Sequence, residues 1–281
     1  MPPTLELVSS RRLTQGIALH RFKPVNSTDH VQLRPTQHIL LEFPKELDPT
    51  AGPRSLTDEQ RQLCFTPCHV ITTKHNDGTA EQSISIISRN GRITSLLGLP
   101  RLNGLTAQVL GVGGGFSPDV LDLSLPSGNL VAVAGGTGAG CFLSVTSSDK
   151  KLPLPSLSEN VHSIRNRLLW SIRGDDFRLV EYVLENELLN PHVWSTEVFV
   201  TTGEEDDGLI AGNTVQFWED KLHSMTRSTV RFYCRRMDEK DMFPDGEAKG
   251  NTVLFCGSKA LEFQIKQWSM SRAKVYVTER T

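Results

Sequence analysis

A glycine-rich turn is the first feature of the sequence that could do chemistry. The stretch VAVAGGTGAGCFLSV, residues 131–145, runs from one apolar segment into another through Gly135, Gly136, Gly138 and Gly140. Where such a turn joins a strand to a helix, its bare backbone lets a pyrophosphate approach the N–H groups at the helix N-terminus. A tight turn that packs closely against its neighbours needs the same residues. The pattern therefore indicates either nucleotide binding or close packing.

The cysteines are the second group of reactive side chains. The segment CFTPCH brings Cys64, Cys68 and His69 together, but a structural zinc site needs a fourth ligand and usually paired spacing, so we expect no metal. The chain has five cysteines, an odd number without the rhythm of a disulfide framework. With no secretory signal at the N-terminus, this usage predicts reduced thiols and a cytoplasmic protein.

The composition excludes two classes of partner. The chain has 281 residues, of which 38% are hydrophobic and 22% charged, with a net charge of −2. There is no basic excess to favour a nucleic-acid partner. No apolar run approaches the roughly 18 residues of a membrane span. The length favours two domains of ordinary size.

The elements that must position these residues change character near residue 125. Before it, short β-rich runs such as IALHRFKP alternate with turn signals, which predicts an antiparallel β-barrel over residues 1–124. After it, apolar strands alternate with helical segments such as DDFRLVEYVLENELL, which predicts a Rossmann-like α/β domain with a parallel sheet over residues 125–281. We expect the boundary in DLSLPSGN, residues 122–129. Ligands bind such sheets at the carboxyl ends of the strands, where the glycine turn falls.

Five short motifs in a common order make the chain similar to the ferredoxin-NADP reductase superfamily. They are GRITS (91–95), GVGGGF (111–116), AGGTGAGCF (134–142), SIR (171–173) and CGS (256–258). The resemblance covers nearly the whole chain. It implies an N-terminal barrel that binds FAD and a second domain that binds NAD(P)H.

The resemblance assigns one set of residues to the nicotinamide nucleotide. Those that would bind NAD(P)H are Gly136, Thr137, Gly138, Ser171, Arg173 and Gly257. It also implies catalytic roles for Cys256, beside the nicotinamide ring, and for Glu279, which matches an acidic position near the family's C-terminus. The residues by themselves also allow purely structural roles. Cys256 would then be a small buried hydrophobe, and Arg173 part of a surface turn.

A second set would hold the flavin. The residues that the resemblance assigns to FAD are Phe65, Thr66, His69, Gly91, Thr94 and Ser95. In LCFT, however, Leu63 stands where the family has an arginine. The loss of that arginine should weaken FAD binding by about 1.5 to 3 kcal/mol. If the segment is extended, Arg61 lies on the same face and could reach the same phosphates. Thr94 could instead cap the helix that it begins.

Two functions follow from these expectations. The resemblance implies an FAD-dependent NAD(P)H oxidoreductase, in which a hydride passes from nicotinamide to flavin and on to a small molecule or an electron-acceptor protein in the inter-domain cleft. The departures at Leu63 and Cys141, where the family has a proline, support the alternative. In that case the scaffold has weak or no flavin binding and catalyses a non-redox cyclisation or isomerisation, or simply binds a small molecule.

Overall fold

The structure, a computed structural model, comprises two compact units. It describes residues 2–48, 55–75, 80–99, 102–117, 120–121, 130–146, 166–189, 194–201, 216, 220, 230–244, 251–270 and 272–278. Unit 1 is made of Met1–Gly115, Gly140–Asp149 and Glu279–Thr281, and unit 2 of Phe116–Ala139 and Lys150–Thr278. The expected boundary at 122–129 lies outside the described residues, so the division into 1–124 and 125–281 stays a prediction.

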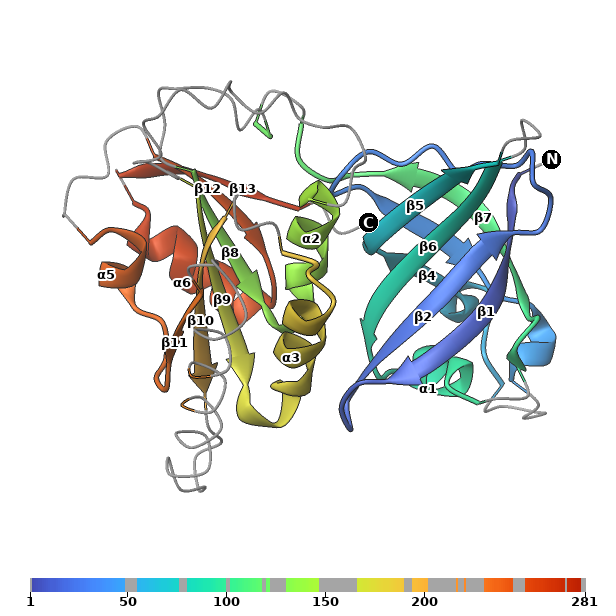
Figure 1. The fold of residues 1–281 in the computed structure, drawn as a ribbon, viewed down its shortest axis with the longest axis horizontal. Coiled ribbons are helices and arrows are strands. Elements are labelled where there is room, and N and C mark those ends of the chain that lie inside the picture. The colour runs from blue at the N-terminus through green and yellow to red at the C-terminus, as the bar shows by residue number, and fades with distance from the viewer. Residues whose placement is uncertain are drawn as a thin grey trace. The chain divides into compact units, whose positions relative to one another are not determined.

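Unit 1 is built on an antiparallel sheet of seven strands (Figure 1). The strands are β1 (Thr4–Arg12), β2 (Ile17–Pro24), β3 (His38–Glu42), β4 (Gln62–Phe65), β5 (Pro67–Lys74), β6 (Ala80–Arg89) and β7 (Thr106–Gly113). Their order in the sheet is β4-β3-β7-β1-β2-β6-β5. The outermost strands, β4 and β5, are consecutive in the chain and separated only by Thr66, so the chain itself joins the two edges. The expected antiparallel barrel is thereby confirmed.

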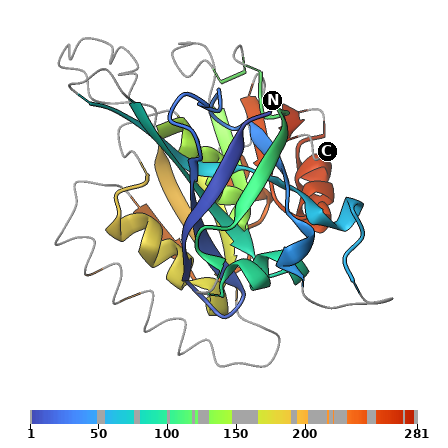
Figure 2. The same cartoon turned by 90° about the vertical axis from the view of Figure 1, so that its right-hand side faces the viewer.

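The inward side chains of these strands form one apolar core. On β1, Leu5 and Leu7 are fully buried, and Phe22 on β2, the register partner of Leu7, is 1% exposed. The alternation follows from the pleat of a strand, which points successive side chains to opposite faces. Helix α1 (Arg92–Leu97) adds Ile93 and Leu97 to the core, and it lies below the strands in both views of the molecule (Figures 1 and 2).

A polar cluster interrupts the interior of the barrel. The imidazole of His20 is fully buried, with Nδ1 2.8 Å from Ser10 Oγ and Nε2 2.9 Å from Ser88 Oγ. Burial lowers the pKa of His20 to about 4. Both ring nitrogens therefore have partners, and the ring is neutral near pH 7.

Helix α2 (Gly140–Thr146) completes the described part of unit 1 and packs on β5. The Ser144 hydroxyl accepts a hydrogen bond from Thr36 N (2.9 Å) and donates to Cys141 O (2.7 Å). Cys141 is 1% exposed. A small side chain there serves the packing of α2 in unit 1.

Unit 2 is a parallel sheet of six strands with helices on its faces. The strands are β8 (Leu130–Gly135), β9 (Arg167–Arg173), β10 (Ser195–Thr201), β11 (Val230–Tyr233), β12 (Asn251–Cys256) and β13 (Ala273–Val277). The main helices are α3 (Arg178–Glu185), α5 (Glu239–Met242) and α6 (Lys259–Trp268). The order β11-β10-β9-β8-β12-β13 reverses direction between β8 and β12, which makes this pair the topological switch point. The expected α/β domain is confirmed.

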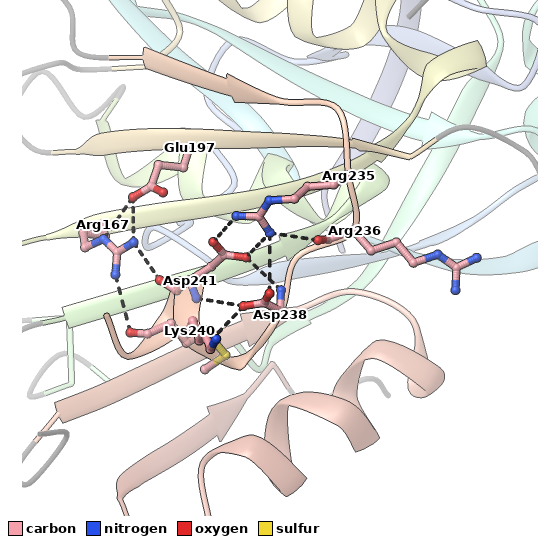
Figure 3. Close-up of polar contacts among 8 residues, drawn as sticks. Arg167, Glu197, Arg235, Arg236, Asp238, Lys240 and Asp241 are labelled. Atoms are coloured by element: carbon pink, nitrogen blue, oxygen red, sulfur yellow. Dashed lines mark hydrogen bonds and ion pairs between the residues drawn. The ribbon is translucent and has the colours of Figure 1, made fainter. Parts of the chain in front are cut away.

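A chain of charged groups fixes α5 against the sheet of unit 2 (Figure 3). The guanidinium of Arg235 donates to both carboxylate oxygens of Asp241, at 2.7 and 2.5 Å, and lies over the rings of Phe199 and Tyr233. Burial opposes ionisation of Asp241, but the hydrogen bond from Arg235 prevails and holds the pKa of that carboxyl below its usual value. Arg167 donates to Asp241 O at 2.7 Å. These contacts tie α5 to β9 and to the end of β11.

Candidate functional site

The residues expected to bind NAD(P)H lie at the carboxyl edge of the parallel sheet in unit 2. Gly135, the last residue of β8, pairs with Ser171 on β9, while Cys256, the last residue of β12, pairs with Ala134. Arg173 ends β9 and is exposed. The sheet register therefore brings together three motifs that are up to 120 residues apart in the sequence.

Two glycine turns pack against each other at this edge. A Cβ on Gly138 would lie 2.2 Å from Cys256 O, and a Cβ on Gly257 would lie 2.8 Å from the Phe255 ring and 3.2 Å from Gly135 Cα. Close packing is therefore one reason for the glycines. Gly136 has a second reason, because its φ of 55° lies in the left-handed region that favours glycine, and this residue is half-buried.

Trp170 stabilises the glycine turn after β8 through a hydrogen bond. Its indole is fully buried in β9, and Nε1 donates to Gly136 O at 3.0 Å. Trp170 was not among the residues predicted from the sequence to form the nucleotide site. The signal available was a tryptophan that directly precedes the SIR motif on an apolar strand, although nothing in that pattern says which carbonyl it meets.

The remaining groups at this edge differ in exposure. Thr137, Ser171 and Cys256 are half-buried. Helix α6 begins at Lys259, and its first turn is capped by Ser258, the residue after Gly257, whose Oγ accepts from Leu261 N at 3.3 Å. The edge thus offers a hydroxyl, a thiol, an exposed guanidinium and a helix N-terminus to an anionic ligand. Glu279, the other expected catalytic residue, lies outside the described residues.

The residues expected to bind FAD are in unit 1, and the aromatic one among them is mostly committed to the core. Phe65 is 8% exposed and makes an edge contact with Phe43, with ring centroids 6.3 Å apart. Thr66, the single residue between β4 and β5, and His69 on β5 are both half-buried. Little of the Phe65 ring is therefore left for stacking on a flavin.

Thr94 caps α1. Its Oγ1 accepts a hydrogen bond from Gly91 N at 2.6 Å and donates to Arg89 O at 2.8 Å, and the residue is 5% exposed. The hydroxyl has thus used its donor on the backbone, the alternative that the sequence left open. Ser95, the next residue, is exposed.

The expected rescue by Arg61 is wrong. Residues Glu59–Arg61 form a 3-10 turn before β4 rather than an extended strand, so Arg61 does not share the face of Leu63. Its side chain is buried, with Nη1 donating to Phe43 O at 2.7 Å and Nη2 in an ion pair with Asp58. A hydrogen bond and the charge of Arg61 lower the pKa of Asp58. This guanidinium stabilises the barrel and is not directed at a ligand.

The CFTPCH segment does not assemble a cation site. Burial raises the pKa of Cys68 to about 12, and its thiol donates to Ser85 O at 3.3 Å. Cys64 is exposed on the neighbouring strand. Within the ranges that the structure describes, no three His, Cys, Asp or Glu side chains are grouped so as to hold a metal ion, and no helix there has both the length and the apolar character to cross a bilayer.

Comparison with solved structures identifies the fold. The flavohem-like FAD/NAD binding domain of nitric oxide dioxygenase from Vibrio cholerae has a TM-score of 0.58 at 12% identity, with 98% of each chain covered. The cytochrome b5 reductase domain of Ulva prolifera nitrate reductase has a TM-score of 0.56 at 14% identity, with 98% of this chain and 97% of that chain covered. The ferredoxin reductase in carbazole 1,9a-dioxygenase has a TM-score of 0.55 at 11% identity, with 99% of this chain and 68% of that chain covered.

Two sequence-based comparisons gave no match. No family model matches the chain, and neither does any curated protein. The likeness to the reductase domains is therefore one of architecture over essentially the full chain, at a sequence identity too low to indicate a shared substrate. The chain shares the two-domain fold of these FAD/NAD-binding and reductase domains, an antiparallel barrel followed by a parallel α/β unit.

Proposed function

We propose that the protein is an NAD(P)H-dependent oxidoreductase whose nucleotide binds at the carboxyl edge of the unit 2 sheet. The observation that supports this most is the pair of stacked glycine turns, Gly135–Gly138 and Cys256–Gly257, at the switch point between β8 and β12. Ligands of open α/β sheets bind at such points because the loops diverge there. The redox class rests on the fold and on the motif resemblance.

The residues at this edge suit the parts of a dinucleotide. Gly136 and Thr137 would bind the pyrophosphate through backbone N–H groups and a hydroxyl. Ser171 and Arg173 would hold the adenosine end, where the guanidinium suits a 2′-phosphate. Cys256 would border the nicotinamide, a half-buried uncharged neighbour that helps to exclude water. When bound, the nicotinamide supplies a hydride.

The FAD fit is poorer, because the expected phosphate contacts are absent. Leu63 is apolar, and the guanidinium of Arg61 is held by Phe43 O and Asp58. The Thr94 hydroxyl is occupied by Gly91 and Arg89. We therefore derive no step through a bound FAD. The final acceptor in our proposal is a small molecule or an electron-acceptor protein, and the expected inter-domain cleft stays a prediction.

The same mismatch favours a second candidate function. A barrel that holds its arginine internally is compatible with a scaffold that has lost flavin binding and catalyses a non-redox cyclisation or isomerisation, or binds a small ligand. In this candidate the glycine turns of unit 2 would serve packing alone, which agrees with the 2.2 Å that would separate a Cβ on Gly138 from Cys256 O.

Nucleotide binding and electron transfer can be tested separately. NADH and NADPH are titrated against tryptophan fluorescence, which should be quenched because Trp170 supports the turn. Arg173→Ala should weaken NADPH about tenfold and leave NADH unchanged, while Arg11→Ala, an exposed arginine of unit 1, should change neither. Anaerobic addition of NAD(P)H to protein with excess FAD should then bleach the flavin absorbance. Nucleotide binding without bleaching would overturn the electron-transfer step, and no nucleotide binding would overturn the proposal and favour the second candidate, in which the glycine turns serve packing alone.

A further inference from the structure

We infer that unit 1 has a ligand site of its own, a pocket that binds the carboxylate of a small organic acid. The pocket lies between the end of β2, the loop that follows it and the adjoining ends of β5 and β6, and its volume is about 340 Å³. That volume is at the lower end of the range of small-molecule sites. The inference goes beyond the proposed reaction, because no residue assigned to the nucleotide or to the flavin lines this pocket.

The strands that line the pocket separate it from the expected flavin motifs. Strand β5 begins at Pro67, directly after Thr66, and His75 of the pocket follows its other end. Strand β6 begins at Ala80, in the pocket, and ends at Arg89, just before the GRITS motif. A strand rises about 3.3 Å per residue, so the length of β5 alone separates the two places by roughly 25 Å. The pocket is therefore a separate place on unit 1.

One wall of the pocket is held in place by Gln82. This side chain is 5% exposed and pairs with the backbone of Val31 in both directions, Oε1 accepting from Val31 N at 2.9 Å and Nε2 donating to Val31 O at 3.0 Å. The preceding loop is closed by its own contacts, because Asn26 Nδ2 donates to Asp29 Oδ2 at 2.8 Å and Asp29 N donates to Asn26 O at 3.0 Å. His30 lies between these two anchors. A wall that is ordered in advance costs less entropy when a ligand binds.

His30 supplies a hydrogen-bond donor to this pocket. Its Nδ1 is buried and has no hydrogen-bond partner among the described residues. A neutral imidazole carries one proton, and an N–H that is buried without an acceptor is costly, so the proton belongs on Nε2. Because His30 lines the pocket, this Nε2–H is the donor that the ring offers to a ligand oxygen.

Lys23 brings a positive charge to the same pocket. Its ammonium lies 3.6 Å from Glu6 Oε2, which is an ion pair but too long for a hydrogen bond, and the side chain is 42% exposed. The three N–H groups of the ammonium are therefore not taken up by Glu6. A carboxylate only accepts hydrogen bonds, so it suits a pocket that offers the charged donor of Lys23 and the neutral donor of His30.

The one acidic group that lines the described pocket does not reverse this preference. Glu81 is 66% exposed, and its Oε2 lies 3.8 Å from His75 Nε2. Water screens a carboxylate that is so exposed. Across the described ranges no three His, Cys, Asp or Glu side chains are grouped for a metal ion, and this includes His30, His75 and Glu81. The pocket is thus better suited to an anion than to a cation.

Apolar side chains supply another part of the pocket wall. Pro24 is buried, Ala80 is half-buried and Val25 is 47% exposed. A ligand whose apolar body covers the exposed part of Val25 removes that surface from water, which is favourable. The pocket therefore fits an acid with a short apolar chain, its carboxylate bound by Lys23 and His30.

The experiment is an NMR titration of the full-length protein with butyrate, butanol and butylammonium, three probes with the same carbon chain, at constant ionic strength. The ring signal of His30, assigned by its loss in His30→Gln, should shift saturably with butyrate. The dissociation constants of the other two probes should be at least about tenfold higher, since neither carries an anionic acceptor. Lys23→Gln should weaken butyrate about tenfold. Lys45→Gln, at an exposed lysine of unit 1 outside the pocket, should leave it unchanged.

Several outcomes would overturn this inference. Butanol or butylammonium that binds as tightly as butyrate would show that the pocket does not recognise a carboxylate. A shift that sodium chloride reproduces, or one that does not saturate, would mean that no site exists. Equal weakening by Lys23→Gln and Lys45→Gln would place the anion elsewhere. The wild-type titrations decide the matter even if Lys23→Gln does not fold. None of these outcomes bears on the proposed function, which the nucleotide titration with Arg173→Ala tests separately.

Discussion

Gly138 and the carbonyl oxygen of Cys256 lie so close together that no side chain fits between them. A Cβ on Gly138 would meet that oxygen at 2.2 Å and the carbonyl carbon at 2.8 Å. Both atoms are backbone, so neither can rotate away as a flexible side chain would. The contact between the two turns of unit 2 therefore requires glycine at position 138, because any Cβ there would clash with the backbone of Cys256.

Gly138→Ala should destabilise unit 2 by about 1 to 3 kcal/mol, the usual cost of overpacking. The matched control is Gly111→Ala on β7, where a Cβ meets nothing within 4 Å and the change should stay within about 1 kcal/mol. Urea unfolding of both variants measures the difference. Equal midpoints for Gly138→Ala and the wild type would mean that the turns are not packed as described.

His20 should make the protein less stable in mild acid. Its pKa is about 4 when folded and 6.5 when unfolded, so the unfolded chain binds a proton that the folded barrel rejects. The stability that neutral His20 contributes is fully present above pH 6.5 and is lost as the pH falls toward 4. The total loss is about 3 kcal/mol. Urea unfolding at pH 7 and pH 5 should show a smaller loss for His20→Asn than for the wild type. The same loss in both proteins would assign the acid sensitivity to other groups.

Arg61 should matter for stability far more than its partner Asp58. Arg61→Ala leaves the Phe43 carbonyl without its donor in a buried position, which costs about 1 to 3 kcal/mol. Asp58→Asn should have a small effect, because the aspartate side chain is exposed at 74%. Thermal unfolding of the two variants checks the order. An Arg61→Ala variant as stable as Asp58→Asn would show that the guanidinium does not support the barrel.

The Arg235 and Asp241 pair should hold α5 in place. Asp241→Asn keeps the shape of the side chain but removes the ionic part of a 2.7 Å contact, which we expect to cost about 1 to 3 kcal/mol. Arg236→Ala is the control, because that side chain points away from the cluster in Figure 3 and the loss should stay within about 0.5 kcal/mol. Hydrogen exchange of the α5 amides should accelerate in Asp241→Asn only. Unchanged exchange there would mean that α5 is held by its apolar contacts alone.

The architecture could be predicted from the sequence because it depends on patterns with a fixed period. Short β-rich runs such as IALHRFKP, separated by turn signals, predicted the strands of the barrel, and these residues now form β2 with Phe22 in the core. The position of the glycine turn after an apolar strand placed it at the carboxyl edge of the sheet. Both inferences use only the neighbours of a residue along the chain.

The flavin side could not be predicted in the same way, because it depends on where single side chains go. Arg61 could have reached the flavin phosphates only from an extended segment, whereas Glu59–Arg61 form a 3-10 turn and its guanidinium binds Phe43 O and Asp58. Phe65 was identified as a ring for stacking, but its contact with Phe43 draws it into the core. Trp170 went unnoticed because its partner, Gly136 O, is 34 residues away in the sequence.

The single-residue junction between β4 and β5 has a consequence for solubility. An open seven-stranded sheet would present unpaired amides along both outer strands, which invites another chain to add on there. Because Thr66 is the whole linker between β4 and β5, the ends of the two outer strands are held close together at this junction. A cut or an insertion at Thr66 would separate the ends of β4 and β5. We expect the result to be self-association of the protein rather than a change in ligand binding.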